Sequence, residues 1–221
     1  MGILVKICGL NSADAADAAA RAGADMVGLN FHPTSPRYLR ADQAGALAGR
    51  LLGKAKLVVV LSDPSDDALA AAITATKPDF VQLHGAETPD RVAAIRARHG
   101  VAIIKAIGVA DATDLRRAAS YEACADIFLF DAKPPPGAAH DGGHGAAFDW
   151  QILRGHTIAR PWLLAGGLSP DNVARAIKSS GAPGVDVSSG VETAPGQKSA
   201  ELIAQFVANA RSAQFATGAP V

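Results

Sequence analysis

Aromatic residues, cysteine and net charge are all scarce in this chain of 221 residues. Phe, Trp and Tyr together make up 5% of it, while Ala and Gly are abundant. This mixture favours helices packed closely on a sheet over an aromatic-rich β-sandwich. Cys8 and Cys124 are too few for a disulfide framework, so we expect two free thiols in a reducing compartment.

The acidic and basic residues balance, with 21 of each and a formal net charge of zero. Bulk electrostatics therefore provide no attraction to nucleic acid or to an anionic membrane. Apolar runs such as 57–61 are only strand-sized, whereas a membrane span needs about 20 apolar residues. The N-terminal sequence MGILVKICGL also lacks a signal-peptide pattern. We expect a cytoplasmic protein with no membrane and no nucleic-acid partner.

Short strand-like runs alternate with Ala-rich helical stretches along the whole chain. The predicted strands are 3–8, 25–31, 56–61, 79–83, 101–106, 126–131, 161–165 and 184–187. The predicted helices are 13–22, 41–52, 65–76, 89–99, 111–120, 148–153, 170–179 and 199–212. Ser12, Ser65, Thr88 and the Ser169-Pro170 pair are predicted N-caps, and Gly23, Gly53, Gly100 and Gly181 are predicted to end helices.

Eight βα units without a break in composition indicate one closed sheet. Closure leaves no exposed strand edge, which favours it over an open doubly wound sheet. The sequence therefore predicts an α/β fold, a single-domain (β/α)8 TIM barrel over 1–212, with 213–221 as a frayed C-terminal tail. In such barrels the active site lies where strands end and βα loops begin.

Cys8 ends the first predicted strand, and period-two alternation places Lys6 on the same face. A nearby ammonium favours the thiolate, so Cys8 is a candidate base or nucleophile. The alternative is that it is a small buried apolar residue, which is how most free cysteines behave. We interpret Cys124, which precedes a strand at the opposite end, as structural.

Two aspartates stand at later strand positions. Asp131 follows four apolar residues in IFLFD, where a carboxylate is costly unless it is paired or used. Its alternative role is to cap nearby backbone N–H groups. Asp186 lies between Val185 and Val187 and is equally compatible with a site residue and with a structural polar group in the barrel.

Two further candidates are a guanidinium and an imidazole. Arg37 lies in HPTSPRYL, a loop stiffened by two prolines, and suits bidentate capture of a carboxylate or phosphate. Without that context it would be an ordinary surface arginine. His84 ends the fourth strand in VQLHG, where it is either a site residue or a hydrogen-bonded structural histidine.

The loops after the last two strands are rich in small residues. Gly166 and Gly167 follow the seventh strand, and Ser188, Ser189 and Gly190 follow the eighth. Barrels often bind phosphate with these two loops, because glycine lets backbone N–H groups approach an anion closely. The sequence therefore predicts a phosphate site there.

A metal site is not expected. His140 and His144 share a Gly-rich loop, but no second cluster of ligands accompanies them. We therefore predict that the chain binds no metal.

The motifs, in their order along the chain, resemble those of the phosphoribosylanthranilate isomerase family. The resemblance extends from about residue 5 to about residue 206, and its combination of motifs is more specific than any one of them. They are KICGL, SPRYL, QLHG, FLFDAK, GGHGAAFDW, LAGGLSPDNV and GVDVSSGVE. Asn30, His32 and the absence of a basic residue before FDW depart from the family pattern.

This resemblance implies a cofactor-free Amadori rearrangement. It converts N-(5-phosphoribosyl)anthranilate to 1-(2-carboxyphenylamino)-1-deoxyribulose 5-phosphate, a small phosphosugar. The implied roles are Asp131 as general acid, Cys8 as general base and Arg37 as partner of the anthranilate carboxylate. The two small-residue loops would bind the phosphate, and Asp186 would contact the ribose or amine. His84 lies at a matching strand end and is assigned to substrate binding.

The implied chemistry sets two expectations for pKa values. Burial beneath Phe128 and Phe130 would raise the pKa of Asp131 and keep it protonated. Lys6 would lower the pKa of the Cys8 thiol towards neutrality. Both expectations concern groups that a structure can place.

Two alternatives and one assembly question stay open. Another phosphate-binding barrel enzyme, such as indole-glycerol-phosphate synthase, would need a catalytic lysine and glutamates at strand ends, and Lys105 lies inside a strand. A catalytically silent barrel that binds a phosphometabolite would have no reason to keep Cys8 and Asp131. The chain is expected to be a monomer or a homodimer.

Overall fold

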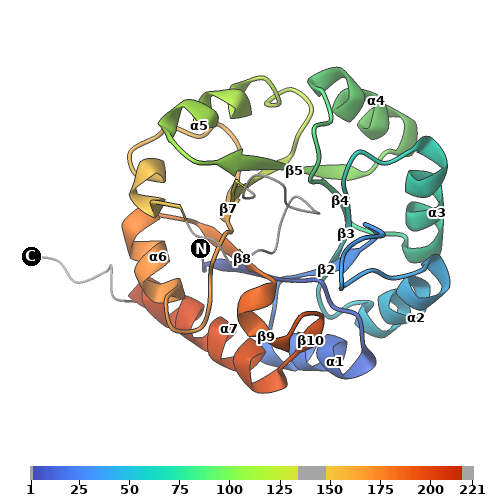
Figure 1. The fold of residues 1–221 in the computed structure, drawn as a ribbon, viewed down its shortest axis with the longest axis horizontal. Helices are drawn as coiled ribbons and strands as arrows, with labels where there is room; N and C mark the ends of the chain where they lie inside the picture. The colour runs from blue at the N-terminus through green and yellow to red at the C-terminus, as the bar shows by residue number, and fades with distance from the viewer. Residues whose placement is uncertain (1, 134–147, 216–221) are drawn as a thin grey trace, which may run out of the picture.

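Eight parallel strands close into a barrel in chain order, from β1 to β8 and back to β1, and the helices surround it (Figure 1). This computed structural model describes residues 2–133 and 148–215. It confirms the predicted (β/α)8 barrel. The barrel strands are β1 Leu4–Cys8, β2 Met26–Asn30, β3 Lys56–Leu61, β4 Phe80–Leu83, β5 Ala102–Val109, β6 Ile127–Ala132, β7 Trp162–Leu164 and β8 Gly184–Val187.

The outer ring holds the α-helices and one short 3-10 helix. A second 3-10 helix and a hairpin occupy the loop after β8. The α-helices are α1 Ala13–Ala22, α2 Ala41–Leu51, α3 Asp66–Thr76, α4 Pro89–His99, α5 Ala112–Ala119, α6 Val173–Ser180 and α7 Ala200–Phe215. The short elements are η1 Trp150–Leu153, η2 Ser189–Val191 and the hairpin β9 Glu192–Ala194 with β10 Gln197–Lys198. Of these, η1 packs between α5 and α6 in the outer ring.

Alternation along each strand divides its side chains between the barrel interior and the helix layer. On β1, Val5 and Ile7 pack in the large core beneath the helices, whereas Lys6 and Cys8 point to the interior. The predicted pairing of Lys6 and Cys8 on one face is therefore confirmed. The interior apolar cluster comprises Cys8, Met26, Val58, Val60, Ile104, Ala106, Ile127, Leu129, Leu163 and Ala165.

Local signals account for most helix ends. Ser12, Ser65 and Thr88 each accept a hydrogen bond from a backbone N–H in the first turn of α1, α3 and α4. The four predicted glycines, among them Gly53 after α2, all have positive φ. These residues relieve unpaired backbone groups at the helix ends, as expected from the sequence.

The start of α6 differs from the prediction. The helix begins at Val173, because residues 170–172 form a turn and Ser169 does not cap it with its side chain. Instead, Asn172 Oδ1 accepts the Ser169 N–H at 2.8 Å, and Asn172 Nδ2 donates to the Gly167 carbonyl at 2.8 Å. Asn172 thus fixes the glycine loop after β7.

Three other predicted boundaries were wrong. The fifth strand was predicted to end at residue 106, but β5 pairs with β6 as far as Val109. The segment predicted as a helix over 148–153 contains the 3-10 helix η1. At the C-terminus α7 continues to Phe215, so residues 213–215 are helical and do not belong to a tail. Its buried positions, spaced three and four apart, continue to Ala213, and the helix packs on α1 and α6. The remaining residues of the predicted tail lie outside the described part of the chain.

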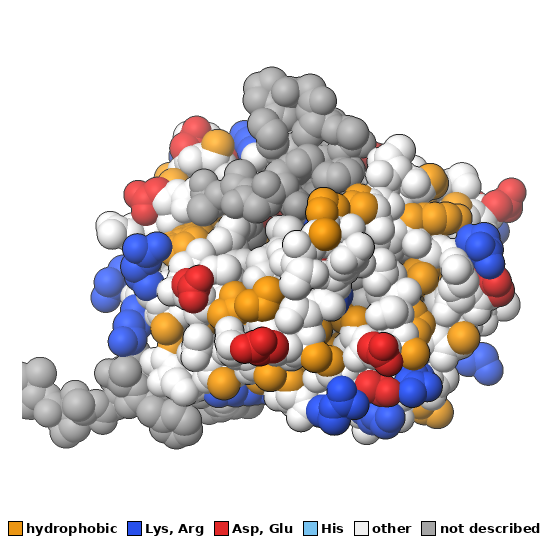
Figure 2. Space-filling model, turned by 60° about the horizontal axis from the view of Figure 1, so that its bottom comes forward, with side chains coloured by type: hydrophobic (Ala, Val, Ile, Leu, Met, Phe, Trp, Pro, Cys, Tyr) orange, Lys and Arg blue, Asp and Glu red, His pale blue; other side chains and the backbone are white. Residues whose placement is uncertain are grey.

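The surface carries both signs of charge. Acidic and basic side chains lie intermixed on the face shown in Figure 2. One surface ion pair joins two helices: Arg50 of α2 lies 2.7 Å from Asp17 of α1. Within residues 2–133 and 148–215, no helix is long and apolar enough to cross a membrane.

We predict that Phe206→Ala destabilises the fold by about 3–5 kcal/mol, because a fully buried aromatic ring leaves a cavity. Phe206 lies on α7, which packs against α1 and so joins the last βα unit to the first. Urea denaturation measures the change. The control Gln205→Ala, one residue away and exposed, should change the free energy of unfolding by less than about 0.5 kcal/mol. Equal effects of both changes would contradict this account of α7.

Candidate active site

Polar side chains gather inside the barrel near the carboxyl ends of its strands. Lys6 of β1 meets Asp186 of β8 at 2.8 Å. His84, directly after β4, meets Asp131 of β6, with 3.3 Å between Nε2 and Oδ2. Three of the predicted site residues, Asp186, His84 and Asp131, thus lie on the interior side together with Cys8.

Cys8 is packed tightly beside this ion pair. It is 7% exposed, and its opposite residue on β2 is Gly28. A Cβ atom at Gly28 would stand 2.8 Å from the Cys8 sulfur, so any larger residue there would displace the thiol. The strand pairing therefore holds the sulfur in one place.

We expected Lys6 to bring the pKa of Cys8 down towards neutrality, and this prediction was wrong. Burial raises the pKa of Cys8 above its ordinary value, the nearby Lys6 ammonium lowers it by less, and Asp186 adds to the increase. Burial alone would lower the pKa of Lys6, but Asp186 and Cys8 hold it above its ordinary value. The ammonium is thus shared between a carboxylate and the thiol, which is why it does not offset desolvation of the thiolate.

Asp131 has polar contacts on both carboxylate oxygens. Oδ1 accepts the backbone N–H of Ala132 at 2.8 Å, and Oδ2 faces His84. The expectation that Phe128 and Phe130 cover this carboxylate was wrong. Both rings belong to the core beneath the helices, because alternation turns them away from the barrel interior.

Arg37 contacts a carboxylate of the chain itself. Its Nε and Nη2 atoms each lie 2.7 Å from an oxygen of Glu192, on β9. Lys198 of β10 binds the same carboxylate at 2.6 Å and also donates to the Ser188 carbonyl at 2.9 Å. Arg37 is 5% exposed and forms a buried network, in place of the open guanidinium that the loop sequence predicts.

The balance of charge in this network is positive. Burial raises the pKa of Glu192, but hydrogen bonds and charge from Arg37 and Lys198 outweigh it and leave the pKa below its ordinary value. Burial lowers the pKa of Lys198, and Glu192 opposes that change. Sequence analysis missed both residues. The only signal was the glutamate that ends the motif GVDVSSGVE.

The two predicted phosphate loops lie against each other. Gly166 and Gly167 both have positive φ, of 84° and 63°, which side-chain-bearing residues rarely adopt. A Cβ atom at Gly190 would overlap the carbonyl oxygen of Leu168. On the same loop, Ser188 Oγ lies 3.3 Å from Lys198 Nζ, and Ser189 begins η2. The loops therefore present backbone groups next to a buried ammonium.

A second buried ion pair fixes the loop that carries His84. Lys105 of β5 donates to Glu87 at 2.8 Å and to the carbonyls of Leu83 and Gly85 at 3.2 and 2.8 Å. These two carbonyls flank His84 in the chain. The Lys105 ammonium, which is 2% exposed, is thus fully engaged in holding the backbone on both sides of His84.

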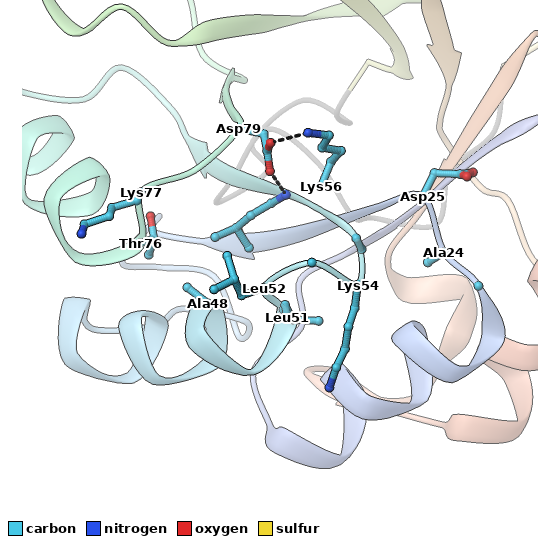
Figure 3. Close-up of a pocket in the computed structure, with 14 residues that line it drawn as sticks. Ala24, Asp25, Ala48, Leu51, Leu52, Lys54, Lys56, Thr76, Lys77 and Asp79 are labelled. Atoms are coloured by element: carbon cyan, nitrogen blue, oxygen red, sulfur yellow. Dashed lines mark hydrogen bonds and ion pairs between the residues drawn. The ribbon is translucent and has the colours of Figure 1, made fainter.

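In the part of the chain that the structure describes, neither a metal site nor the large hollow forms part of this site. Within the described residues no group of three or more His, Cys, Asp or Glu side chains could hold a metal. His140 and His144 lie outside those residues, so the absence of a metal stays a prediction. A hollow of about 710 Å³ lies at the opposite end of the barrel, between α2 and the start of β3, where Lys56 and Asp79 pair on its wall (Figure 3). None of the predicted site residues lines it.

The fold and these side chains define a (β/α)8 barrel with a thiol, a carboxylate and several buried cations at its carboxyl end. A model of the family described as N-(5'-phosphoribosyl)anthranilate (PRA) isomerase matches residues 5–209. The chain is 51% identical over 211 residues to N-(5'-phosphoribosyl)anthranilate isomerase of Paracoccus denitrificans, covering 95% of this chain and 98% of that protein.

Solved structures agree with this match. Phosphoribosyl anthranilate isomerase from Thermotoga maritima has a TM-score of 0.85 and 34% identity, covering 95% of this chain and 99% of that one. A phosphoribosyl anthranilate isomerase in complex with reduced 1-(o-carboxyphenylamino)-1-deoxyribulose 5-phosphate has a TM-score of 0.82 and 33% identity, with the same coverage. The chain belongs to the N-(5'-phosphoribosyl)anthranilate isomerase family, and the resemblance found in the sequence is confirmed.

The raised pKa of Cys8 predicts a distinctive alkylation profile. In a Cys124→Ser background, the rate of Cys8 labelling by iodoacetamide should still be rising above about pH 8.5, where a free thiol is half ionised. The measurement is the labelling rate from neutral pH upward, with Cys8→Ser as the blank. A rate that has levelled off at neutral pH would show that Lys6, and not burial, dominates.

Proposed function

We propose that this chain converts N-(5-phosphoribosyl)anthranilate to 1-(2-carboxyphenylamino)-1-deoxyribulose 5-phosphate, with Asp131 as general acid and Cys8 as general base. The observation that carries the proposal is the placement of these two groups, on β6 and β1, inside one barrel mouth with different polar neighbours. The related structure bound to the reduced product supports the choice of substrate.

The first step opens the sugar ring. Asp131 donates its proton to the furanose oxygen, the bond between that oxygen and C1′ breaks, and the anthranilate nitrogen forms a double bond to C1′. The carboxylate left behind is stabilised by the Ala132 N–H and by His84, which already contact its two oxygens.

The second step moves a proton from carbon. The Cys8 thiolate removes the proton at C2′, and the resulting enolamine tautomerises to the ketone. A thiolate whose pKa is raised by burial is a stronger base than a free thiolate, although it is a smaller fraction of the thiol at neutral pH. The Lys6 ammonium offsets part of the cost of forming it. No cofactor enters either step, since the sugar carbons exchange oxidation state internally.

Binding is assigned to the surrounding cations and loops. Arg37 would hold the anthranilate carboxylate through its Nη1 side, because Nε and Nη2 are bound to Glu192. The phosphate would lie at the loops of Gly166 and Gly167 and of Ser188 to Gly190, beside Lys198. Asp186 would contact the ribose or amine from beside Lys6, and His84 the substrate from beside Asp131. The oligomeric state stays a prediction.

Cys8→Ser and Asp131→Asn should each lower kcat by at least about 10²-fold, because each removes a proton-transfer group. Turnover of N-(5-phosphoribosyl)anthranilate measures this, and calorimetry with reduced 1-(o-carboxyphenylamino)-1-deoxyribulose 5-phosphate checks that binding persists. Cys124→Ser is the matched control and should keep wild-type turnover. Full activity of either site variant would refute its assigned role.

Failure of the folded wild-type chain to restore growth of a tryptophan auxotroph lacking this step would refute the function.

Arg37→Lys should raise KM with little change in kcat, because a single ammonium replaces a planar fork at the carboxylate end of the substrate. Binding of ribose 5-phosphate, which lacks the anthranilate carboxylate, should be unchanged and serves as the ligand control. An unchanged KM, or an equal loss for both ligands, would contradict the carboxylate contact. The conservative change keeps a cation beside Glu192 and so avoids leaving that carboxylate with Lys198 alone.

A further inference from the structure

One polar side chain inside the barrel has no role in the steps above. Gln82 lies on β4, two residues before His84, and both side chains point to the interior. It is fully buried, beside Val60 of β3 and Ile104 of β5 in the strand register. Its neighbours at this level are apolar, so an amide here needs an explanation.

The amide has one hydrogen bond and one unpaired atom. Gln82 Nε2 lies 2.9 Å from Nδ1 of His84. Its Oε1 atom is buried and has no hydrogen-bond partner among the described residues. An unpaired buried carbonyl destabilises the fold, so Gln82 contributes less to stability than an apolar residue of its size would. The hydrogen bond to His84 is therefore the one interaction that an apolar residue at position 82 could not make.

The contact determines which nitrogen of His84 carries the proton. An amide nitrogen can only donate, so Nδ1 must accept and, in the neutral ring, the proton lies on Nε2. Nε2 is the atom that faces Asp131 Oδ2, at 3.3 Å. The charged groups fixed around the loop are Asp131 on β6, the Lys105–Glu87 pair and Asp63. Lys105 holds the backbone on both sides of His84, and Asp63 accepts the Ala86 N–H.

We infer that Gln82 is a positioning residue that fixes the Nε2–H tautomer of His84 and so keeps a hydrogen-bond donor on Asp131. This inference rests on the proposed function, because the donor matters to catalysis only if Asp131 becomes a carboxylate during turnover. When Asp131 releases its proton, His84 stabilises the new charge without reorienting. Without Gln82 the imidazole can place its proton on Nδ1 and present an unprotonated nitrogen to Asp131.

The test is Gln82→Met, which keeps the length of the side chain and removes both polar atoms. We expect kcat to fall roughly tenfold, the size associated with a hydrogen bond to a charged group, while KM stays within about twofold. Resistance to urea should be unchanged or higher, since the variant removes an unpaired carbonyl. A structural role would instead show as lost stability with kcat retained. Ile104→Val, in the same layer of the barrel, is the control and should keep wild-type kcat.

A second readout does not depend on activity. The ¹⁵N chemical shifts of His84, assigned by comparison with His84→Asn and recorded where the ring is neutral, report its tautomer. The wild-type chain should show the Nε2–H form and Gln82→Met a mixture. An Nδ1–H wild type, an unchanged tautomer in the variant or an unchanged kcat would each overturn the inference. Inactive wild-type protein with the Nε2–H tautomer would instead contradict the proposed function and the catalytic consequence, while the tautomer assignment would stand.

Discussion

A lysine and an aspartate meet inside the barrel where its first and last strands join. Lys6 and Asp186 are partners in the register of β1 and β8, and their side chains pair at 2.8 Å with the lysine fully buried. Removing one member of such a pair leaves an uncompensated charge, at a cost of about 3–5 kcal/mol. The closure of the sheet and the electrostatics around Cys8 therefore depend on the same two side chains.

The other buried charges follow the same pattern of fixing loops at the carboxyl end. Lys105 and Glu87 hold the backbone around His84, and Glu192 joins Arg37 to Lys198. The pairs of Lys105 with Glu87 and of Arg37 with Glu192 connect separate βα units, whereas Glu192 and Lys198 join the two strands of the hairpin β9–β10. The result is a site whose charged groups are positioned mainly by other polar groups, while the apolar interior buries Cys8 and raises its pKa.

The barrel and its strand ends could be predicted from the sequence because alternation and capping are local. They correctly placed Lys6 with Cys8 and put Ser12, Ser65 and Thr88 at helix starts. The same alternation, had it been applied to IFLFD, would have turned Phe130 away from Asp131. Glu192 pairs with Arg37 across 155 positions, a distance over which no local pattern operates. The Cys8 pKa was missed because its sign depends on how burial and two opposite charges balance.

The pairing of Arg37 with Glu192 bears on selectivity. A buried arginine without a partner would reject any ligand unable to neutralise it, since desolvating a lone guanidinium is expensive. Glu192 supplies such a partner from within the chain. In the proposed function the substrate carboxylate therefore joins an existing ion pair, and an analogue without an acidic group leaves no lone guanidinium behind. We propose that the chain consequently discriminates less sharply against such analogues.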